Sequence, residues 1–542
     1  MSRRDLDNAA LADRLARFAA VLDLAGASPY SVRAYGRAAD LVRATQVDVA
    51  ALVRAGRVRE LRGIGASIEA RLRELVETGE IAELAELERE TDPELVGIGR
   101  YLGLSPKRAV EIGRTLGVRT VDELRAAAAE GRLREVPGIG PETERRLRER
   151  LAREVPERRP RVLLNRARAL CDSIGAAVGG VVAGDVRRWC DRPERLVVVC
   201  ASDVPQRELD VFASLPEIVA VVERDERRAV GVTVDGVAVE VVVGPPPQAG
   251  TALLRATGSA AYVAALEPLP EAAEEAEVYG ALGLPFCPPE LRESAFRDDP
   301  PRLLELADIR GDLHCHTTRS DGRASIYEMA VAARDRGYDY LAICDHTKSV
   351  RVVPGLAADD VRAQGEEIAE ANDRLAPFRV LRGIECDIRA DGSLDLPDEV
   401  LAELDWVQAS LHAGQRRPRA ELTKQVLEAM RNPHVRGLSH PTGRLIDRRP
   451  ENALDLEQTI EVALETGVAL EVNGLPDRLD LRDEHVRLAV EAGAPIVVST
   501  DAHSIQGLGN MELAVHTARR GWATAANVVN TRPLDELLRR GS

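Results

Sequence analysis

Histidine is absent from the first 313 of the 542 residues, and all nine histidines lie between His314 and His516. Aromatic side chains make up only 3% of the chain, and three lysines accompany its many arginines. The seven cysteines are scattered without a CxxC pair, which argues against a disulfide scaffold and for reduced thiols. Neither an apolar signal core nor a run of about 18 apolar residues occurs, so the sequence predicts a cytoplasmic protein without a membrane span.

The formal net charge is −16, so the chain as a whole does not have the positive charge that would attract nucleic acid. The charge is uneven, since residues 1–150 are close to neutral and the acidic excess lies behind them. An acidic back half suits a domain that binds cations. A chain of this length also predicts more than one domain.

Residues 1–155 are predicted to be almost entirely helical, because leucines recur there at helical spacing. Three similar glycine turns interrupt the helices: Leu61-Arg-Gly63-Ile-Gly65, Leu95-Val-Gly97-Ile-Gly99 and Val136-Pro-Gly138-Ile-Gly140. Residues 160–245 change character, and we expect a small sheet with strands at Leu196–Cys200, Ile218–Val222, Val230–Val234 and Val237–Val243. The prolines of residues 285–305 predict a linker.

From Asp308 to about Leu538, short apolar strands alternate with helical stretches. The predicted strands are Asp312–Leu313, Tyr340–Cys344, Arg379–Ile384, Trp406–Leu411, Gly437–Ser439, Ala469–Val472 and Pro495–Ser499. This alternation predicts a parallel sheet, and about seven such units can close into a barrel. In barrels of this kind the chemistry takes place at the C-terminal ends of the strands.

Nine histidines and carboxylates lie at these strand ends, except that Asp321 stands on the loop after the first strand. Gathered imidazole and carboxylate groups are typical of a site for several transition-metal ions. The candidate ligands are His314, His316, Asp321, His346, Glu385, His412, His440, Asp501 and His503. The other three histidines, His434, His485 and His516, are interpreted as surface or packing residues. Glu471, Asn473, Arg478 and Asp480 follow another strand and either line the rim or are ordinary loop residues.

This pattern resembles the PHP (polymerase and histidinol phosphatase) domain. The matching residues are His314-x-His316, Asp321-Gly, Asp345-His346, Gly383-x-Glu385, His412, His440-Pro-Thr-Gly and Asp501-x-His503. The resemblance implies a distorted seven-stranded barrel with up to three Mn²⁺ or Zn²⁺ ions. One ion would bind His314, His316, Glu385 and Asp501, a second Glu385, His412 and His440, and the third Asp321, His346 and His503. The residues expected to carry catalysis, which would be phosphoester hydrolysis, are His314, His316, Glu385, Asp501 and His503.

The turns at Gly63-Ile-Gly65 and Gly138-Ile-Gly140 each open an arginine-bearing helix and look like helix-hairpin-helix motifs. Their glycines let backbone N–H groups approach a DNA phosphate without reading sequence. A glycine-capped helical hairpin without DNA contact is the alternative interpretation.

The order of these segments resembles that of a bacterial family X DNA polymerase. The short motifs Ser28-Pro-Tyr-Ser-Val-Arg and Thr257-Gly-Ser also match that family. The resemblance implies a multidomain protein: an all-α helix-hairpin-helix N-terminal region, an α+β nucleotidyltransferase-like palm and a C-terminal α/β distorted (β/α)7 barrel. The implied boundaries are a helical DNA-end-binding domain at 1–90, a helical thumb or fingers-like region at 91–156, the palm at 157–284, the linker at 285–305 and the PHP barrel at 306–542. The implied partner is gapped, nicked or 3′-ended DNA, bound without sequence specificity by a nucleoid-associated monomer.

The palm departs from that family, which needs three aspartates to hold two Mg²⁺ ions. In the matching register these positions fall on Arg195, Val197 and Glu240. An arginine at a cation site replaces attraction with repulsion, so we expect no Mg²⁺ in the palm and no polymerase activity. In the alternative, the register is shifted and Asp185, Asp191 or Asp203 substitutes. The lysine that performs 5′-deoxyribose-phosphate lysis in related enzymes matches Arg71, which cannot form a Schiff base.

These observations favour a metal-dependent phosphoesterase that acts as a 3′-5′ exonuclease, processes 3′ ends or incises abasic sites in DNA repair. Three alternatives stay open. The chain is an active gap-filling polymerase with an attached exonuclease, a DNA-binding scaffold without catalysis, or a phosphatase of small molecules.

Overall fold

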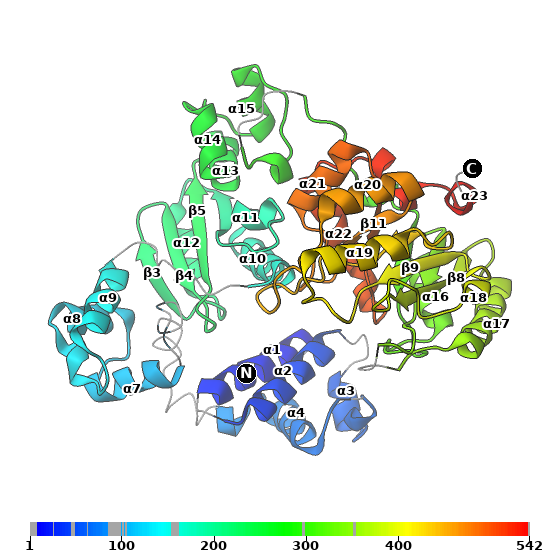
Figure 1. Ribbon diagram of the computed structural model, residues 1–542. Helices are drawn as coiled ribbons and strands as arrows, with labels where there is room; N and C mark the ends of the chain where they lie inside the picture. Colours follow the sequence, from blue (N-terminus) through cyan, green and yellow to red (C-terminus); the bar gives the residue numbers. More distant parts are fainter. Residues whose placement is uncertain are drawn as a thin grey trace. The chain divides into compact units, whose positions relative to one another are not determined.

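The computed structural model describes residues 8–24, 27–44, 49–61, 63–84, 99, 102, 104, 106–152, 162–294, 299–350 and 354–539 (Figure 1). The chain divides into two compact units. The first unit contains residues 1–162, 170–182 and 194–252, and the second contains residues 163–169, 183–193 and 253–542. In the described part of the chain, no helix combines the length and the apolar character needed to cross a membrane.

The front of the first unit is helical, as predicted, with one core that includes Leu11, Phe18 and Leu72 and a second core that includes Ile112, Leu124 and Leu147. These helices are α1 (Asn8–Leu24), α2 (Pro29–Ala44), α3 (Val49–Arg54), α4 (Ala66–Thr78), α7 (Pro106–Leu116), α8 (Val121–Ala129) and α9 (Pro141–Ala152), with 3-10 turns at Val58–Glu60 and Arg132–Glu135. The glycine turn predicted at Leu95–Gly99 lies outside the described residues except for Gly99.

A five-stranded mixed sheet follows, in the order β1-β2-β5-β4-β3. Its strands are β1 (Gly180–Ala183), β2 (Leu196–Ala201), β3 (Ala220–Arg224), β4 (Arg228–Val232) and β5 (Ala238–Gly244). The four predicted strands are present with ends shifted by one or two residues, and the short β1 was not predicted. The helices of this part of the chain are α10 (Leu164–Val178), α11 (Gly184–Arg187), α12 (Pro205–Ala213), α13 (Ala249–Thr257), α14 (Ala260–Leu266) and α15 (Glu275–Leu282).

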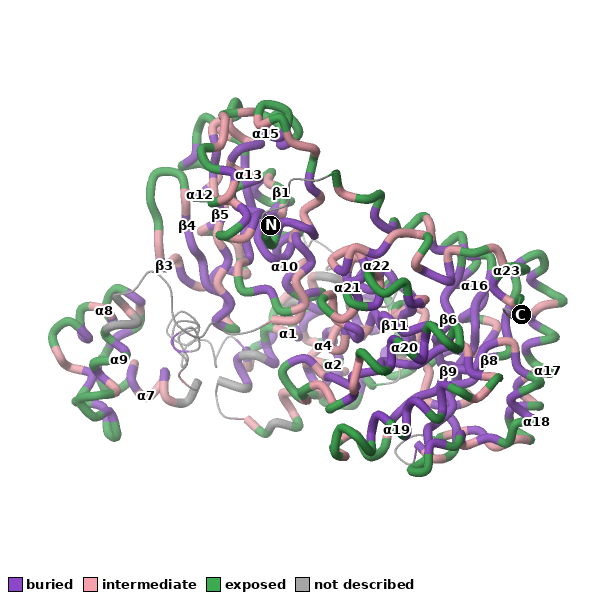
Figure 2. The backbone as a smooth tube through the Cα atoms, turned by 45° about the horizontal axis from the view of Figure 1, so that its top comes forward, coloured by how far each residue is buried: buried purple, intermediate pink, exposed green. Residues whose placement is uncertain are grey.

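The second unit is built on seven parallel strands, as the strand–helix alternation predicted, in the order β12-β11-β10-β9-β8-β7-β6. They are β6 (Gly311–Cys315), β7 (Tyr340–Ile343), β8 (Arg379–Asp387), β9 (Trp406–Ser410), β10 (Gly437–Leu438), β11 (Ala469–Asn473) and β12 (Ile496–Ser499). Helices surround them (Figure 1): α16 (Ile326–Arg334), α17 (Ala358–Leu375), α18 (Asp398–Leu401), α19 (Arg419–Met430), α20 (Leu456–Thr466), α21 (Asp483–Ala492), α22 (Met511–Arg520) and α23 (Leu534–Leu538). Figure 2 shows the strands buried and the outer helices partly exposed.

Polar side chains join the first and last strands into a nearly closed barrel. The amide of Asn530 donates to the carbonyls of Gly311 in β6 and Val498 in β12, at 2.7 and 2.8 Å. At the other end of the seam, Asp312 accepts hydrogen bonds from the backbone N–H and hydroxyl of Thr500. Because Asn530 and Asp312 are fully buried, these bonds form away from water, where leaving them unmade is costly.

The stretch predicted as a linker is packed where the structure describes it. Leu291 and Leu303 join a buried cluster with Tyr262 and Tyr279, and Arg292 is fully buried against Glu275. Proline-rich sequence indicated a loop here. It did not reveal that apolar and charged side chains of the same stretch fill a core.

Candidate metal centre

The nine candidate ligands lie at one end of the barrel because parallel strands share the direction of their carboxyl ends. His314 lies within β6 and Glu385 within β8, whereas six others follow their strands directly. Those six are His316, His346, His412, His440, Asp501 and His503. Asp321 comes from the loop between β6 and α16. The structure therefore brings together all nine residues that the sequence singled out.

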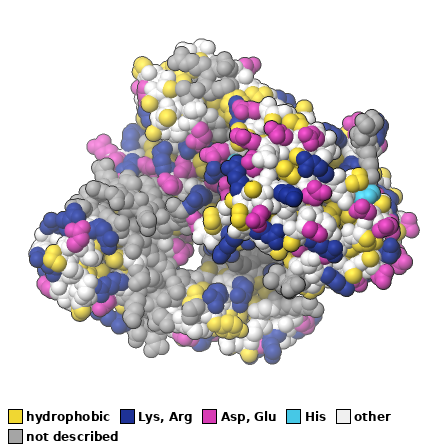
Figure 3. Space-filling model, viewed as in Figure 1, with side chains coloured by type: hydrophobic (Ala, Val, Ile, Leu, Met, Phe, Trp, Pro, Cys, Tyr) yellow, Lys and Arg dark blue, Asp and Glu magenta, His cyan; other side chains and the backbone are white. Residues whose placement is uncertain are grey.

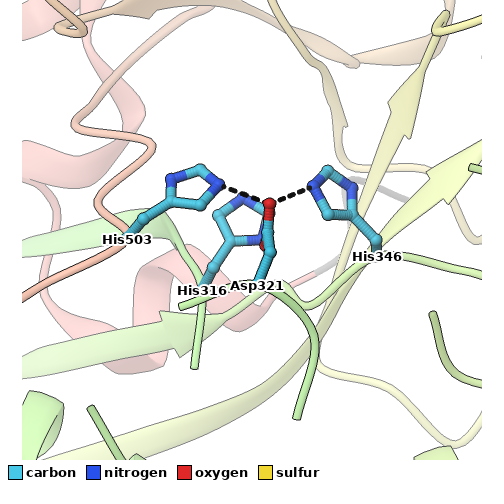
Figure 4. Close-up of side chains that lie close together, drawn as sticks. All are labelled: His316, Asp321, His346 and His503. Atoms are coloured by element: carbon cyan, nitrogen blue, oxygen red, sulfur yellow. Dashed lines mark ion pairs between the residues drawn. The ribbon is translucent and has the colours of Figure 1, made fainter. Parts of the chain in front are cut away.

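The first group forms around Asp321, which lies between His503 and His346 (Figure 4). Oδ2 of Asp321 lies 3.2 Å from Nε2 of His503 and 3.6 Å from Nε2 of His346. His316 completes the group, with its Nδ1 3.7 Å from Oδ1 of Asp321. The resemblance grouped Asp321, His346 and His503, and His316 is the addition.

The second group lies deeper and contains His314, His316 and Asp501. Nε2 of His316 is 3.0 Å from Oδ1 of Asp501, and Nε2 of His314 is 3.8 Å from the same oxygen. Oε2 of Glu385 lies 3.6 Å from Nε2 of His314. The two nitrogens of His316 thus face different groups.

The third group gathers around Glu385, whose carboxylate faces histidines on both sides. Its Oε1 lies 3.0 Å from Nε2 of His440 and 3.5 Å from Nε2 of His412. Its Oε2 lies 2.8 Å from Nδ1 of His346, so His346 belongs to this group as well as the first. Glu385 is almost completely buried and stands where a ligand shared between ions would stand.

The donor set fits transition-metal ions. Nδ1 of His316 is buried without a hydrogen-bond partner among the described residues. Buried polar atoms in proteins are otherwise nearly always satisfied, so this nitrogen has room for a partner that the described residues do not supply. Mixed imidazole and carboxylate donors suit Mn²⁺ and Zn²⁺.

Burial and charge shift the ionisation of the cluster in a consistent way. Burial alone would raise the pKa of Glu385 and of Asp501, but the surrounding histidines outweigh it and hold both well below the usual range. Burial lowers the pKa of His346, yet Glu385 and Asp321 raise it to about 10. For His316, burial and the neighbouring histidines lower the pKa to about 4. The carboxylates are thus ionised and ready to bind cations.

Glu471 lies behind the candidate ligands and holds two of them in place. The sequence had suggested instead that it lines the rim or is an ordinary loop residue. It lies in β11, fully buried, and its Oε1 accepts a hydrogen bond from Nδ1 of His314 at 2.6 Å. Its Oε2 accepts from the backbone N–H of His440 at 2.6 Å. With Nδ1 protonated, His314 presents Nε2 to the cluster. Asp480 is also fully buried and accepts from Thr442, so it too is absent from the rim.

Other ligands are oriented in the same manner. Nδ1 of His412 lies 3.2 Å from Asp387, and Nδ1 of His503 lies 2.8 Å from the carbonyl of Asp501, so both present Nε2 inward. Two of the candidate ligands have left-handed backbone, His440 with φ of 26° and Asp501 with φ of 52°. Such backbone costs energy and is found mainly at functional sites.

The two glycine turns of the first unit have the same local geometry. Gly63 and Gly138 have φ of 111° and 77°, a region that favours glycine. A side chain added at Gly65 or Gly140 would meet nothing within 4 Å, so the backbone before α4 and α9 is open to a phosphate. Figure 3 shows basic side chains among acidic ones over the region of α7 to α9.

Arg71 follows the first turn but is engaged within the protein. Its guanidinium pairs with Glu74 at 3.0 Å and also with Glu83. It also lies over the ring of Phe18, 5.8 Å from the centroid. These contacts give Arg71 a packing role in the helical core.

Comparisons with known proteins agree with this architecture. Residues 6–81 match the family described as "Helix-hairpin-helix domain", residues 102–153 "SAM-like Helix-hairpin-helix tandem", and residues 312–474 "PHP domain". The protein named "DNA polymerase/3'-5' exonuclease PolX" of Bacillus subtilis (strain 168) is 34% identical over 556 residues, covering 96% of this chain and 97% of that relative. The chain belongs to the family X DNA polymerases.

This family X chain also resembles shorter proteins through its barrel alone. A "Probable phosphatase" of Syntrophotalea carbinolica is 29% identical over 229 residues, which cover 40% of this chain and 90% of that relative. Another "Probable phosphatase", of Acetivibrio thermocellus, is 30% identical over 201 residues, with 35% and 78% covered. The chain is therefore an enzyme with a PHP phosphoesterase domain on a family X scaffold.

The three positions that the sequence comparison matched to palm aspartates lie on or beside two neighbouring strands. The parallel register of β2 and β5 sets Val197 beside Glu240, with Arg195 just before β2. Glu240 pairs with Arg228 of β4, and Arg228 also pairs with Glu223 at 2.7 Å. The single acid at the three matching positions is thus neutralised by an arginine of the neighbouring strand.

Proposed function

We propose that this chain is a metal-dependent phosphoesterase that trims DNA as a 3′-5′ exonuclease, processes 3′ ends or incises abasic sites, and that it has lost polymerase activity. The observation that supports it best is the convergence of nine imidazole and carboxylate groups, with Nδ1 of His316 buried and without a hydrogen-bond partner among the described residues. The relative's printed name includes a 3′-5′ exonuclease, which matches this chemistry. All nine residues are proposed as ligands of up to three Mn²⁺ or Zn²⁺ ions.

The cluster's own residues prepare the site for a phosphate ester. Bound ions supply positive charge that holds phosphate oxygens and neutralises the leaving oxygen. Glu385 brings histidines from three strands to one carboxylate, which fixes the spacing of the groups. Glu471 holds the proton on Nδ1 of His314 and keeps Nε2 free for binding. The folded barrel thereby holds its proposed ligands in position before a metal ion binds, so their ordering takes place during folding.

The front half contributes DNA contact. The paired turns at Gly63 to Gly65 and Gly138 to Gly140 expose backbone before two helices, which suits phosphate contacts that ignore sequence. We propose that gapped, nicked or 3′-ended DNA binds there, that the enzyme acts as a monomer, and that it works in the cytoplasm at the nucleoid.

The loss of polymerisation is proposed from the palm. Two Mg²⁺ ions need several carboxylates, and the matching positions hold Arg195, Val197 and an ion-paired Glu240. Replacing attraction with repulsion at one of these positions, and hydrocarbon at another, removes the affinity for the ions.

The test is digestion of an end-labelled primer–template with Mn²⁺, with and without dNTPs. We expect the primer to shorten in both cases and not to be extended. Asp501→Ala is expected to abolish shortening while DNA binding in a gel shift is retained, and His434→Ala serves as a histidine control outside the cluster.

Template-directed extension that survives Asp501→Ala would refute the proposed loss of polymerase activity. Absence of both shortening and phosphate release with Mn²⁺, Zn²⁺ and Co²⁺ would remove the proposed hydrolase and favour a DNA-binding scaffold.

A further inference from the structure

Arg478 lies beside the metal cluster with a donor left unused. It stands on the loop between β11 and α21, and its Nε lies 3.8 Å from Oδ2 of Asp501, beyond hydrogen-bond distance. That carboxylate already accepts from Asn473 at 3.0 Å. Nη1 of Arg478 is buried without a hydrogen-bond partner among the described residues. A buried guanidinium donor without an acceptor is costly, so the position calls for an anion.

Arg478 lies next to one ligand group of the cluster. Its Nε is 3.8 Å from Oδ2 of Asp501, the carboxylate whose Oδ1 lies 3.0 Å from Nε2 of His316. The guanidinium therefore lies at the edge of the cluster, where it would meet the free oxygens of a bound phosphate ester.

Arg444 holds the backbone that presents Arg478. Its Nε donates to the carbonyl of Arg478 at 2.7 Å, and its Nη2 donates to the carbonyl of Leu479. Arg444 follows the ligand segment His440-Pro-Thr-Gly and is almost completely buried. The Arg444 side chain thus connects the loop after β10 to the loop after β11 and holds the backbone of Arg478 in place.

The partner of Arg444 comes from the palm sequence. Oδ2 of Asp191 lies 2.7 Å from Nη1 of Arg444. Trp189, two residues earlier, packs in one buried cluster with Leu479 and stacks on His516 with ring centroids 3.6 Å apart. Residues 183–193 belong to the same compact unit as the barrel. The palm segment therefore contacts both Arg444 and the loop that it holds.

We propose that Arg478 binds the phosphate of the DNA substrate at the metal cluster, and that Asp191 of the palm positions it through Arg444. This inference rests on the proposed hydrolysis of DNA phosphate esters. It gives the palm segment a use that does not require nucleotide addition: it supports a catalytic residue of the barrel. Arg478 is the residue that touches the substrate, while Asp191 and Arg444 are positioning residues.

The first test replaces Arg478 and measures kcat and KM on a 5′-labelled single-stranded oligonucleotide with Mn²⁺. Arg478→Ala is expected to lower kcat/KM about 10- to 100-fold, as expected for one lost charge-assisted hydrogen bond. Arg478→Lys should recover part of the loss, because it keeps the charge but not the planar fork. Arg448→Ala, on an exposed arginine paired with Asp477, is the control and should change kcat/KM less than twofold.

The second test removes one ion pair from the palm segment at a time. Asp191→Ala breaks the pair with Arg444, and Arg192→Ala breaks the exposed pair with Asp447. Both pairs join the segment to the barrel, but only the first is tied to Arg478. We expect Asp191→Ala to lower kcat/KM about 3- to 10-fold with the same division between kcat and KM as Arg478→Ala. Arg192→Ala should stay within twofold.

The double variant decides between positioning and general support. If Asp191 acts through Arg478, then Asp191→Ala has no further effect once Arg478 is alanine. Losses that multiply in the double variant would overturn the positioning role. Equal activity of Arg478→Ala and the wild type would overturn the phosphate contact.

A binding measurement separates this inference from the proposed function. Thymidine 5′-monophosphate is titrated calorimetrically into the Zn²⁺-loaded protein, and Arg478→Ala is expected to bind it about tenfold more weakly. If the wild type does not hydrolyse DNA but its affinity for thymidine 5′-monophosphate still depends on Arg478, only the proposed hydrolysis is wrong. If the wild type hydrolyses DNA but its affinity for the nucleotide does not depend on Arg478, only the role inferred for Arg478 is wrong.

Discussion

Replacing Glu471 with glutamine is expected to weaken metal binding without removing a ligand. The carboxylate accepts from Nδ1 of His314 at 2.6 Å, from Gln408 at 3.2 Å and from the backbone N–H of His440 at 2.6 Å. Glutamine keeps the size of the side chain but has no charge and only one acceptor oxygen. Nδ1 of His314 and the N–H of His440 therefore cannot both keep their acceptor, and His314 loses the carboxylate that increases the basicity of Nε2.

The size of the effect follows from the position of Glu471. It is fully buried, so no water replaces the lost carboxylate oxygen. Loss of a carboxylate behind a metal-binding histidine typically lowers metal affinity about 10- to 100-fold, which corresponds to about 1.4–2.8 kcal/mol. We therefore expect the Mn²⁺ concentration for half-maximal hydrolysis to rise by that factor. At saturating Mn²⁺, kcat should stay within a few-fold of the wild type because all nine ligands remain.

The assay is a Mn²⁺ titration of the metal-free protein, followed by calorimetry and by the rate of oligonucleotide shortening. Glu290→Gln is the matched control, because Glu290 is buried and its Oε1 lies 2.8 Å from Nδ1 of His516, outside the candidate cluster. It should leave the Mn²⁺ dependence unchanged. An unaltered Mn²⁺ affinity in Glu471→Gln would show that Glu471 does not tune His314.

Three further predictions concern protonation and the barrel seam. In the metal-free protein, Glu385 and Asp321 outweigh burial and raise the pKa of His346 to about 10, so Mn²⁺ binding at pH 7 should release protons and tighten as pH rises; calorimetry in buffers of different ionisation enthalpy measures this. His516 and Arg519 outweigh burial and lower the pKa of Glu290 to about 2, so Glu290→Gln should lower the free energy of unfolding by up to about 3 kcal/mol at pH 7. The stabilisation by the Glu290 carboxylate is present above the unfolded pKa of about 4.3 and is lost as pH falls towards 2. Urea unfolding of the variant and the wild type should therefore show a smaller difference in stability at pH 3 than at pH 7. Asn530→Ala should destabilise the barrel by about 2–4 kcal/mol in urea unfolding, and an unchanged midpoint would contradict the bridging role of its amide.

The sequence singled out the nine candidate ligands because each lies at or near a strand end, a transition that hydrophobic pattern and loop residues make visible. His346 after Tyr340–Ile343 and Asp501 after Ile496–Ser499 illustrate this. Their grouping was harder to predict. His316 contacts two groups with different ring nitrogens, and sequence does not specify which nitrogen faces which neighbour.

The residues that hold the candidate ligands in place could not be predicted from the sequence either. Glu471 lies between Leu470 and Val472, and all three are buried. In a closed parallel barrel both faces of a strand are covered, so the alternation that marks an exposed face is lost. Likewise, nothing in the spacing of Asp191 and Arg444 indicated that palm sequence packs with the barrel, because that contact joins distant parts of the chain. The charge pairing was readable only from the folded arrangement.

The seam between β6 and β12 has a consequence for how the enzyme comes into being. His314 emerges from the ribosome long before Asp501 and His503, yet the second ligand group needs residues from both ends of the barrel sequence. An unfinished polypeptide therefore has no complete site. The nine candidate ligands can come together only when translation has passed residue 503 and the last strand has docked, so the glycine turns proposed to contact DNA are made first and the proposed metal centre last.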